Sequence, residues 1–212
     1  MNSVQKTERI KLSNNREKKR EDLKERLTTA AEALIIEHGL GGLKARDVTE
    51  RAGCALGALY TAFPDIDHLI MAVNLRTLDR IGAALKLRKA EWSDPGSVLC
   101  GLASVYVDFA LDNLALWRAL FNHRMADGSD GPDWYRQAHE VLIREIVAPL
   151  AALRPDLPAD LRVTRAKTLF AAVHGVVHLS TQARFTGAPR DQLKSEVIAL
   201  VETLVRGSQP AA

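Results

Sequence analysis

Two histidines, His174 and His178, lie four residues apart in a segment without charged side chains. On a helix this spacing places both imidazoles on one face, where they can coordinate zinc or haem iron. The His-Glu-x-x-His pattern of zinc proteases is absent, because residues 175–177 are Gly-Val-Val. A third ligand would come from another helix, from His139 or His123. One hypothesis is therefore a helical-bundle metal-binding protein or enzyme that uses His139, His174 and His178; histidines satisfied within a core or pocket are the commoner alternative.

Aromatic side chains accompany these histidines in the second half of the chain. A ligand pocket is mostly apolar with a few polar anchors, and histidines can supply such anchors. The same residues also fit a plain hydrophobic core, so both interpretations stay open. The candidate ligand-binding residues are Phe109, Trp117, Phe121, Trp134, His139, His174 and His178.

Sequence patterns for catalysis are missing from the chain. It has no nucleophile–base motif, no glycine-rich phosphate loop and no paired-carboxylate site. Asp127 and Asp130 lie in a turn-rich stretch, where solvation is the expected role. We therefore predict a protein that is not an enzyme, with no catalytic residue, no bound metal and no cofactor.

Helices must position the candidate side chains. Alanine (30 residues) and leucine (29) together exceed a quarter of the 212 residues, and both favour helix. Residues that favour strands are few, so the predicted fold class is all-α, in one or two domains. Pro149 is expected to bend or end the helix around it. Apolar spacings of three and four predict helices at about 23–38, 45–52, 56–63, 65–89, 97–112, 114–123, 134–153, 159–185 and 190–206.

The net charge of +3 is unevenly distributed along the chain. Residues 1–20 hold seven basic and two acidic side chains, and their composition predicts a flexible basic arm. Such an arm suits a polyanionic partner, although a solvated tail has the same composition.

The expected location is the cytoplasm, without a membrane partner. Cys54 and Cys100 are isolated, which is typical of a reduced protein, and the N-terminus lacks the apolar core of a signal peptide. The longest run without charged residues, 168–183, is too short to span a bilayer and is predicted to form a buried helix.

The segment 44–69 contains two short predicted helices separated by residues 53–55. This arrangement is typical of a helix-turn-helix, in which the first helix braces the second and the second enters a DNA major groove. Gly57 allows close approach of the backbone to a phosphate. Tyr60 can offer its hydroxyl to a phosphate while its ring packs.

This segment resembles the signature of the TetR family of transcriptional regulators. The matching marks, at the family's spacing and after a helix that ends in Gly39, are Ala52-Gly53, Gly57, Leu59-Tyr60, Phe63 and Leu69. The resemblance implies a three-helix DNA-binding domain on a larger helical body that binds ligand and dimerises. We accordingly expect a basic arm at 1–20, a DNA-binding domain at 21–66 and the body at 67–212. Residues 172–175 also resemble a His-Gly element of one subgroup, without the Trp that precedes it there.

The resemblance also implies partners and contacts. The implied partners are a double-stranded DNA operator, a small-molecule effector and a second copy of the chain, joined through the last two helices. Thr61 would read bases together with Lys44 and Arg46, and the small apolar residues would touch thymine methyl groups. The predicted DNA-binding residues are Lys44, Arg46, Ala55, Leu56, Gly57, Ala58, Tyr60 and Thr61.

Four positions depart from the family's pattern. Lys44, Ala55, Ala62 and Ile66 stand where the family usually has Thr, Ser or Thr, His and Lys. Residues 55–62 also include no Arg, Asn or Gln for a bidentate base contact. A weak, non-specific DNA-binding protein is therefore a further hypothesis beside the expected one, a repressor released by a small hydrophobic or aromatic ligand.

Overall fold

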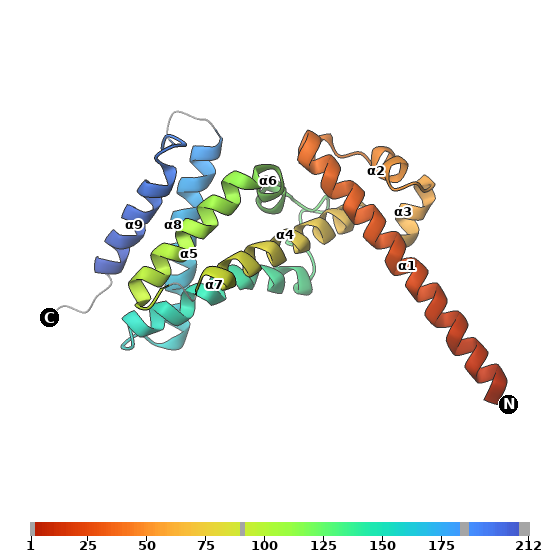
Figure 1. The fold of residues 1–212 in the computed structure, drawn as a ribbon, viewed down its shortest axis with the longest axis horizontal. Coiled ribbons are helices and arrows are strands. Elements are labelled where there is room, and N and C mark those ends of the chain that lie inside the picture. Colours follow the sequence, from red (N-terminus) through yellow and green to blue (C-terminus); the bar gives the residue numbers. More distant parts are fainter. Residues whose placement is uncertain (1–2, 90–91, 183–186, 208–212) are drawn as a thin grey trace. The chain divides into compact units, whose positions relative to one another are not determined.

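The computed structural model describes the backbone of residues 3–89, 92–182 and 187–207, and the side chains of residues 15–88, 92–182 and 187–207. The described backbone contains helices and no strand, which confirms the all-α prediction (Figure 1). In chain order the elements are α1 Ser3–His38, the 3₁₀ helix η1 Leu40–Gly42, α2 Ala45–Arg51, α3 Leu56–Ala62, α4 Ile66–Lys89, α5 Pro95–Asp112, α6 Leu114–Asn122, α7 Asp133–Leu153, α8 Ala159–Thr181 and α9 Leu193–Gly207.

The chain divides into two compact units. Unit 1 comprises Met1–Leu75 and Arg118–Ser129, and unit 2 comprises Arg76–Trp117 and Asp130–Ala212. The division falls within α4 and within α6, so each of these helices contributes residues to both units. Unit 1 thus contains the predicted DNA-binding segment together with the first part of α4 and the end of α6.

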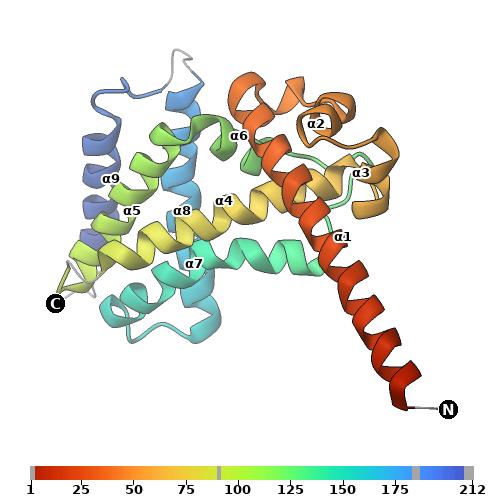
Figure 2. The same ribbon diagram turned by 45° about the vertical axis from the view of Figure 1, so that its right-hand side comes forward.

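Helix α1 begins at Ser3, so the prediction of an arm without regular structure over residues 1–20 was wrong for the described part, 3–20. The physical reason is that Lys, Arg and Glu are good helix formers, and neither Gly nor Pro precedes Gly39. An ion pair of 3.3 Å between Arg26 Nε and Asp22 Oδ2 adds support between successive turns. Within unit 1, the N-terminal half of α1 extends beyond α2 and α3 (Figure 2).

The core of unit 1 forms where α1 packs against α2 and α3. Leu27 and Ile35 of α1, Val48 of α2 and Leu59 of α3 are fully buried. Arg26 Nη1 donates to the carbonyl oxygen of Ala52 at 3.1 Å, and so satisfies a backbone acceptor at the end of α2. This core packs the two short helices, of seven residues each, against α1.

Gly53 makes the turn between α2 and α3. Its φ of +66° lies in the left-handed region, which is strained for residues with a Cβ. The backbone N–H of Cys54 donates to the carbonyl oxygen of Thr49 at 3.0 Å, which closes the end of α2. The turn therefore depends on a glycine at this position.

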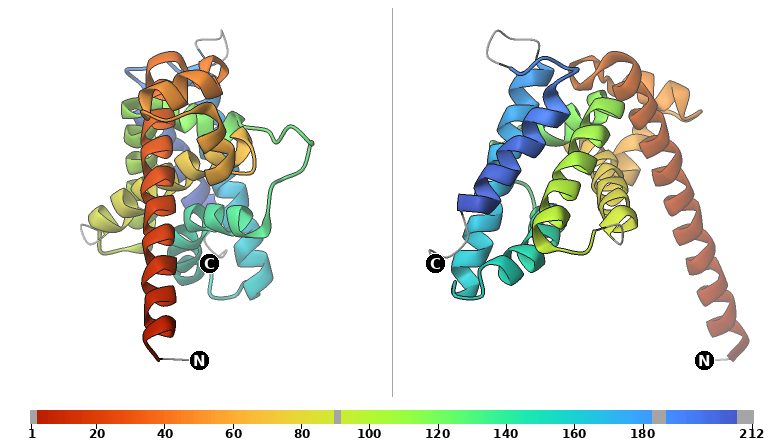
Figure 3. Two further views of the ribbon diagram at one scale, coloured as in Figure 1. Left: turned by 90° about the vertical axis from the view of Figure 1, so that its right-hand side faces the viewer. Right: turned by 60° about the vertical axis from the view of Figure 1, so that its left-hand side comes forward.

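In unit 2, α5 packs against α7, α8 and α9 (Figures 1 and 3). Asp94 caps its N-terminus by accepting the Ser97 N–H at 3.0 Å, and Pro95 occupies the first helical position, where no N–H is needed. Helix α7 continues past Pro149 to Leu153, so this proline does not end the helix.

Helix α8 is buried on one side only. In the run 168–182, Val173 and Val177 are buried, whereas Ala171 and Leu179 are exposed. The prediction of a buried helix was therefore wrong for half of its surface; residue 183 lies outside the described residues. In the described part of the chain, no single helix is long and apolar enough to cross a membrane.

Candidate nucleic-acid interface and ligand cavity

The predicted DNA-binding residues gather on the outer side of α2 and α3. Seven of the eight are exposed, and Ala58 is half-buried. Leu56 and Tyr60 of α3 have 40% and 55% of their surface exposed, although both are large and apolar or aromatic. Within unit 1, α3 thus buries Leu59 and Ala62 and leaves its other side open for a partner.

This face offers few groups that can read bases. The hydroxyl of Thr61 donates to the carbonyl oxygen of Gly57 at 3.0 Å, which leaves its oxygen as an acceptor. Lys44 and Arg46 are exposed and have no ion-pair partner among the described residues. Arg51, by contrast, is bound to Glu37 at 2.7 Å, and this hydrogen bond lowers the pKa of the Glu37 carboxyl. Among the eight predicted DNA-binding residues, the polar side-chain groups are therefore two cations and two hydroxyl groups.

In unit 2, five rings form a cluster between α5, α6 and α8. The ring of Trp117 lies 5.2 Å from that of His174 and 6.1 Å from that of His178, measured between centroids. Phe170 stacks on His174 at 5.6 Å, and Tyr106 contacts Phe170 edge-on at 5.5 Å. The spacing of residues 170, 174 and 178 places all three on one side of α8.

A chain of hydrogen bonds runs through this cluster. Trp117 Nε1 donates to the hydroxyl oxygen of Tyr106 at 3.0 Å, and that hydroxyl lies 2.8 Å from His174 Nδ1. The Tyr106 hydroxyl thus accepts from the indole N–H, and it hydrogen-bonds His174 in the direction that the imidazole tautomer sets. Burial, followed by the charge of His178, lowers the pKa of His174 to about 4. Burial also raises the pKa of Tyr106, so the cluster is uncharged at this end near neutral pH.

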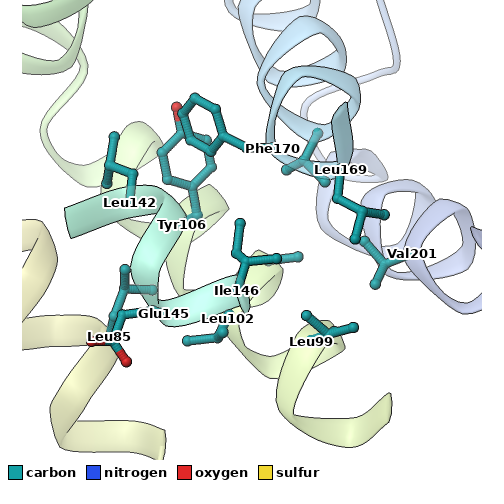
Figure 4. Close-up of a pocket in the computed structure, with 12 residues that line it drawn as sticks. Leu85, Leu99, Leu102, Tyr106, Leu142, Glu145, Ile146, Leu169, Phe170 and Val201 are labelled. Atoms are coloured by element: carbon teal, nitrogen blue, oxygen red, sulfur yellow. The ribbon is translucent and has the colours of Figure 1, made fainter. Parts of the chain in front are cut away.

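A cavity of about 50 Å³ adjoins the cluster (Figure 4). Aliphatic side chains from α4, α5, α7, α8 and α9 line it, together with the rings of Tyr106 and Phe170 and the side chain of Glu145. Figure 4 shows the two rings at one end of the cavity, with the Tyr106 hydroxyl pointing away from the aliphatic lining. The two rings offer no hydrogen-bonding group to a molecule in the cavity, so the cavity suits an apolar group.

The seven predicted ligand-binding residues lie in several places, and none lines this cavity. Trp117, His174 and His178 lie together in the ring cluster, next to the two rings, Tyr106 and Phe170, that line the cavity. Phe109 is buried in α5. The remaining three fall elsewhere: Phe121 in unit 1, exposed Trp134 at the start of α7, and His139 one turn later against Tyr135 at 4.7 Å.

The structure does not support the histidine metal site. Among the described residues, no group of three or more His, Cys, Asp or Glu side chains is placed to hold a metal ion. His139 Nδ1 bonds the carbonyl oxygen of Tyr135, and His123 Nε2 bonds Asp67. His174 and His178 stack face to face at 5.7 Å, and in the described part of the chain Nδ1 of His178 has no hydrogen-bond partner.

None of the cavity-lining residues was identified from the sequence, and Tyr106 and Phe170 are the aromatic ones among them. Phe170 lies four residues before His174, so the i, i+4, i+8 series 170, 174, 178 is a signal that was available in the sequence. Tyr106 lies on a different helix, and its contact with that series depends on how α5 packs against α8. The aliphatic lining carries no signal that separates it from ordinary core.

Two family models match the chain. Residues 27–73 match "Bacterial regulatory proteins, tetR family", and residues 99–204 match "Tetracyclin repressor-like, C-terminal domain". No curated protein matches the sequence.

Solved structures share the fold over most of the chain. A protein with unknown function from Rhodococcus sp. RHA1 is similar with a TM-score of 0.70 and 25% identity, covering 87% of this chain and 94% of that one. RolR, solved in complex with resorcinol, has a TM-score of 0.64 and 20% identity, with 92% and 98% covered. FadR from Bacillus subtilis, solved in complex with stearoyl-CoA, has a TM-score of 0.62 and 16% identity, with 84% and 97% covered.

Proposed function

This chain belongs to the TetR family of bacterial transcriptional regulators, and from this premise we propose that it is a repressor released from operator DNA by a small hydrophobic molecule. The apolar cavity in unit 2 is the observation that supports release by a small molecule. Protein interiors are close-packed, so space lined by aliphatic side chains and rings is a natural receptor for an apolar ligand.

The DNA-reading half rests on α2 and α3. We propose that α3 enters the major groove with Leu56, Tyr60 and Thr61 toward the bases, while Lys44 and Arg46 contact phosphates or base edges from α2. The remaining proposed contacts are Ala55, Gly57 and Ala58, whose small size permits close approach.

A homodimer would present two such helices to one face of the DNA. Helices α8 and α9 lie side by side, and α8 exposes Leu161, Val163 and Leu179 to 38%, 39% and 43% of their surface (Figure 3). Exposed apolar side chains on one helix suit association with a second copy through α8 and α9.

The mechanism we propose is a population shift. An effector that prefers the conformation with low DNA affinity moves the two recognition helices out of register with the half-sites. By linkage, such an effector raises the thermal stability of the free protein and weakens its binding to the operator.

The test begins with DNA selected by the protein from a random pool, whose sequence defines the operator. Fluorescence anisotropy with the selected DNA and with scrambled DNA then gives both dissociation constants. Repression requires strong preference for the selected sequence and release by a small apolar compound that also raises the melting temperature. If no apolar compound in a broad screen releases the selected DNA, that result would contradict the effector role.

A second candidate function is non-specific DNA binding, favoured by the sparse polar content of the α3 face. Equal affinity for selected and scrambled DNA, with the same salt dependence, would support this candidate over the repressor.

A further inference from the structure

A second cavity, of about 160 Å³, lies next to the first in unit 2. Leu169 of α8 lines both cavities. Arg154 and Arg165 line the second cavity, whereas no cationic side chain lines the first. The two cavities thus differ in charge and meet at one leucine.

The lining residues show that the cavities follow one another along the same three helices. On α7 the lining passes from Ile146 to Leu150, and on α9 it passes from Val201 to Leu204. On α8 the two linings overlap between Leu169 and Val173, and the lining of the second cavity alone continues to Arg165. Val173 and Arg165 lie eight positions apart on this helix, a rise of roughly 12 Å at 1.5 Å per residue.

The two cavities together form one groove, and its two ends differ in charge. Arg154 is held by Asp156, through Nη2–Oδ2 at 2.6 Å and Nε–Oδ1 at 2.8 Å. Arg165 is exposed and has no ion-pair partner among the described residues. At the other end, the first cavity is apolar apart from the carboxylic side chain of Glu145. An anionic head is therefore attracted to the Arg165 end, and an alkyl tail suits the largely apolar first cavity.

We propose that the ligand of this groove is a medium-chain carboxylate, with its alkyl tail in the first cavity and its carboxylate on Arg165. The alkyl tail passes Leu169, the residue that lines both cavities. The inference rests on the proposed function, because it gives the chemical class of the effector. It adds a specificity residue, Arg165, that the apolar cavity alone does not supply.

The test measures binding of decanoate to the full-length protein by isothermal titration calorimetry, with 1-decanol as the uncharged ligand of equal chain length. Arg165→Gln should weaken decanoate binding about ten- to a hundredfold, as expected for the loss of one charge-assisted hydrogen bond, and leave 1-decanol binding unchanged. Lys167→Gln is the matched control: this lysine is exposed on the same helix and lines neither cavity. It should leave both ligands unaffected.

The position of the alkyl tail is tested by placing larger side chains in the first cavity. Ala103→Leu and, separately, Val201→Met should weaken decanoate and 1-decanol alike, because both ligands place an alkyl chain there. Two variants are used so that one remains informative if overpacking unfolds the other, which a thermal melt reveals. One decanoate per chain is the expected stoichiometry.

Equal decanoate affinities for the Arg165 and Lys167 variants, or no decanoate binding, would overturn the proposal. The anisotropy assay with selected DNA distinguishes failure of the proposed carboxylate site from failure of the proposed repressor function. Decanoate that binds through Arg165 without loosening DNA supports the ligand site and contradicts the effector role. Release of DNA by another apolar compound, with no decanoate binding, supports the repressor and overturns the carboxylate site.

Discussion

His123 Nε2 donates to Asp67 Oδ1 across 2.9 Å, and Oδ2 of the same carboxylate accepts the backbone N–H of Ala126 at 2.9 Å. Only 5% of the His123 side chain and 14% of the Asp67 side chain are exposed. Asp67 lies in the first turn of α4, and His123 directly follows α6. The contact therefore joins the beginning of α4 to the end of α6 within unit 1. Helix α6 also carries Trp117, which belongs to the ring cluster of unit 2.

Replacing the carboxylate should weaken this junction. Asp67→Asn removes the charge and offers an N–H where an acceptor is needed, so we expect the free energy of unfolding to fall by about 1–3 kcal/mol. Asp79→Asn, at an exposed position on the same helix, is the control and should change stability little. Urea denaturation measures both. Equal midpoints for the two variants would show that the contact does not contribute to stability.

The basic end of α1 should contribute to DNA affinity. Arg16 and Arg20 are exposed and share one side of α1 with Leu27, which packs into the core of unit 1, whereas Lys18 lies on the opposite side. Arg16→Ala with Arg20→Ala should reduce the slope of log affinity against log salt by about two, because each phosphate contact contributes roughly 0.9.

The single variant Lys18→Ala provides the matched comparison and should leave the slope unchanged. An unaltered slope in the double variant would mean that this end of α1 does not contact DNA.

Ile66 opens α4 as a half-buried apolar residue at the position where the family usually has a phosphate-binding Lys. Ile66→Lys should tighten binding to selected and scrambled DNA by a similar factor, because phosphate contacts carry little sequence information. Anisotropy titrations with both DNAs measure the two factors. A gain confined to selected DNA contradicts the prediction, and a lower melting temperature would show that Ile66 is needed for packing instead.

His174 should make the protein less stable in mild acid. Its pKa of about 4 in the folded state lies below the ordinary value of 6.5, so the unfolded chain binds a proton that the folded protein does not between these pH values. The free energy of unfolding is highest above pH 6.5 and falls as the pH drops toward 4, by about 1–2 kcal/mol, because the half-buried ring stays partly screened by solvent.

His174→Gln should remove this part of the pH dependence, while His38→Gln, at an exposed position, should preserve it. Urea denaturation between pH 4 and pH 7.5 gives the slopes. Parallel profiles for the wild type and the His174 variant would rule out this role for His174.

The helix-turn-helix could be predicted closely because its signals are local. Gly39 ends α1, Gly53 makes the turn, and Pro64 follows α3, so the boundaries depend on the conformational limits of individual residues. The structure places α2 at Ala45–Arg51 and α3 at Leu56–Ala62, within one residue of the expected ends. The prediction of a flexible basic arm is wrong over residues 3–20, because the Lys, Arg and Glu residues of this polar segment favour helix.

The ligand region could be predicted only in outline. His174 and His178 were expected on one helical face, and the structure places them together with Trp117. The partner that completes the hydrogen-bond chain, Tyr106, comes from α5, and no periodicity within one helix reports which neighbour it meets. Trp134 was grouped with these aromatic residues by type, yet 48% of its surface is exposed.

The sequence by itself determined the helical fold class, the helix-turn-helix and the family, because helix propensity, glycine turns and apolar spacing act over a few residues. The tertiary structure alone decided that α4 and α6 are each shared between two units, that Asp67 meets His123, and that a cavity adjoins the cluster of rings. The physical reason is that a cavity and a buried polar contact arise from how side chains of distant segments pack against one another, and an aliphatic residue that lines a cavity has the same local pattern as one that fills a core.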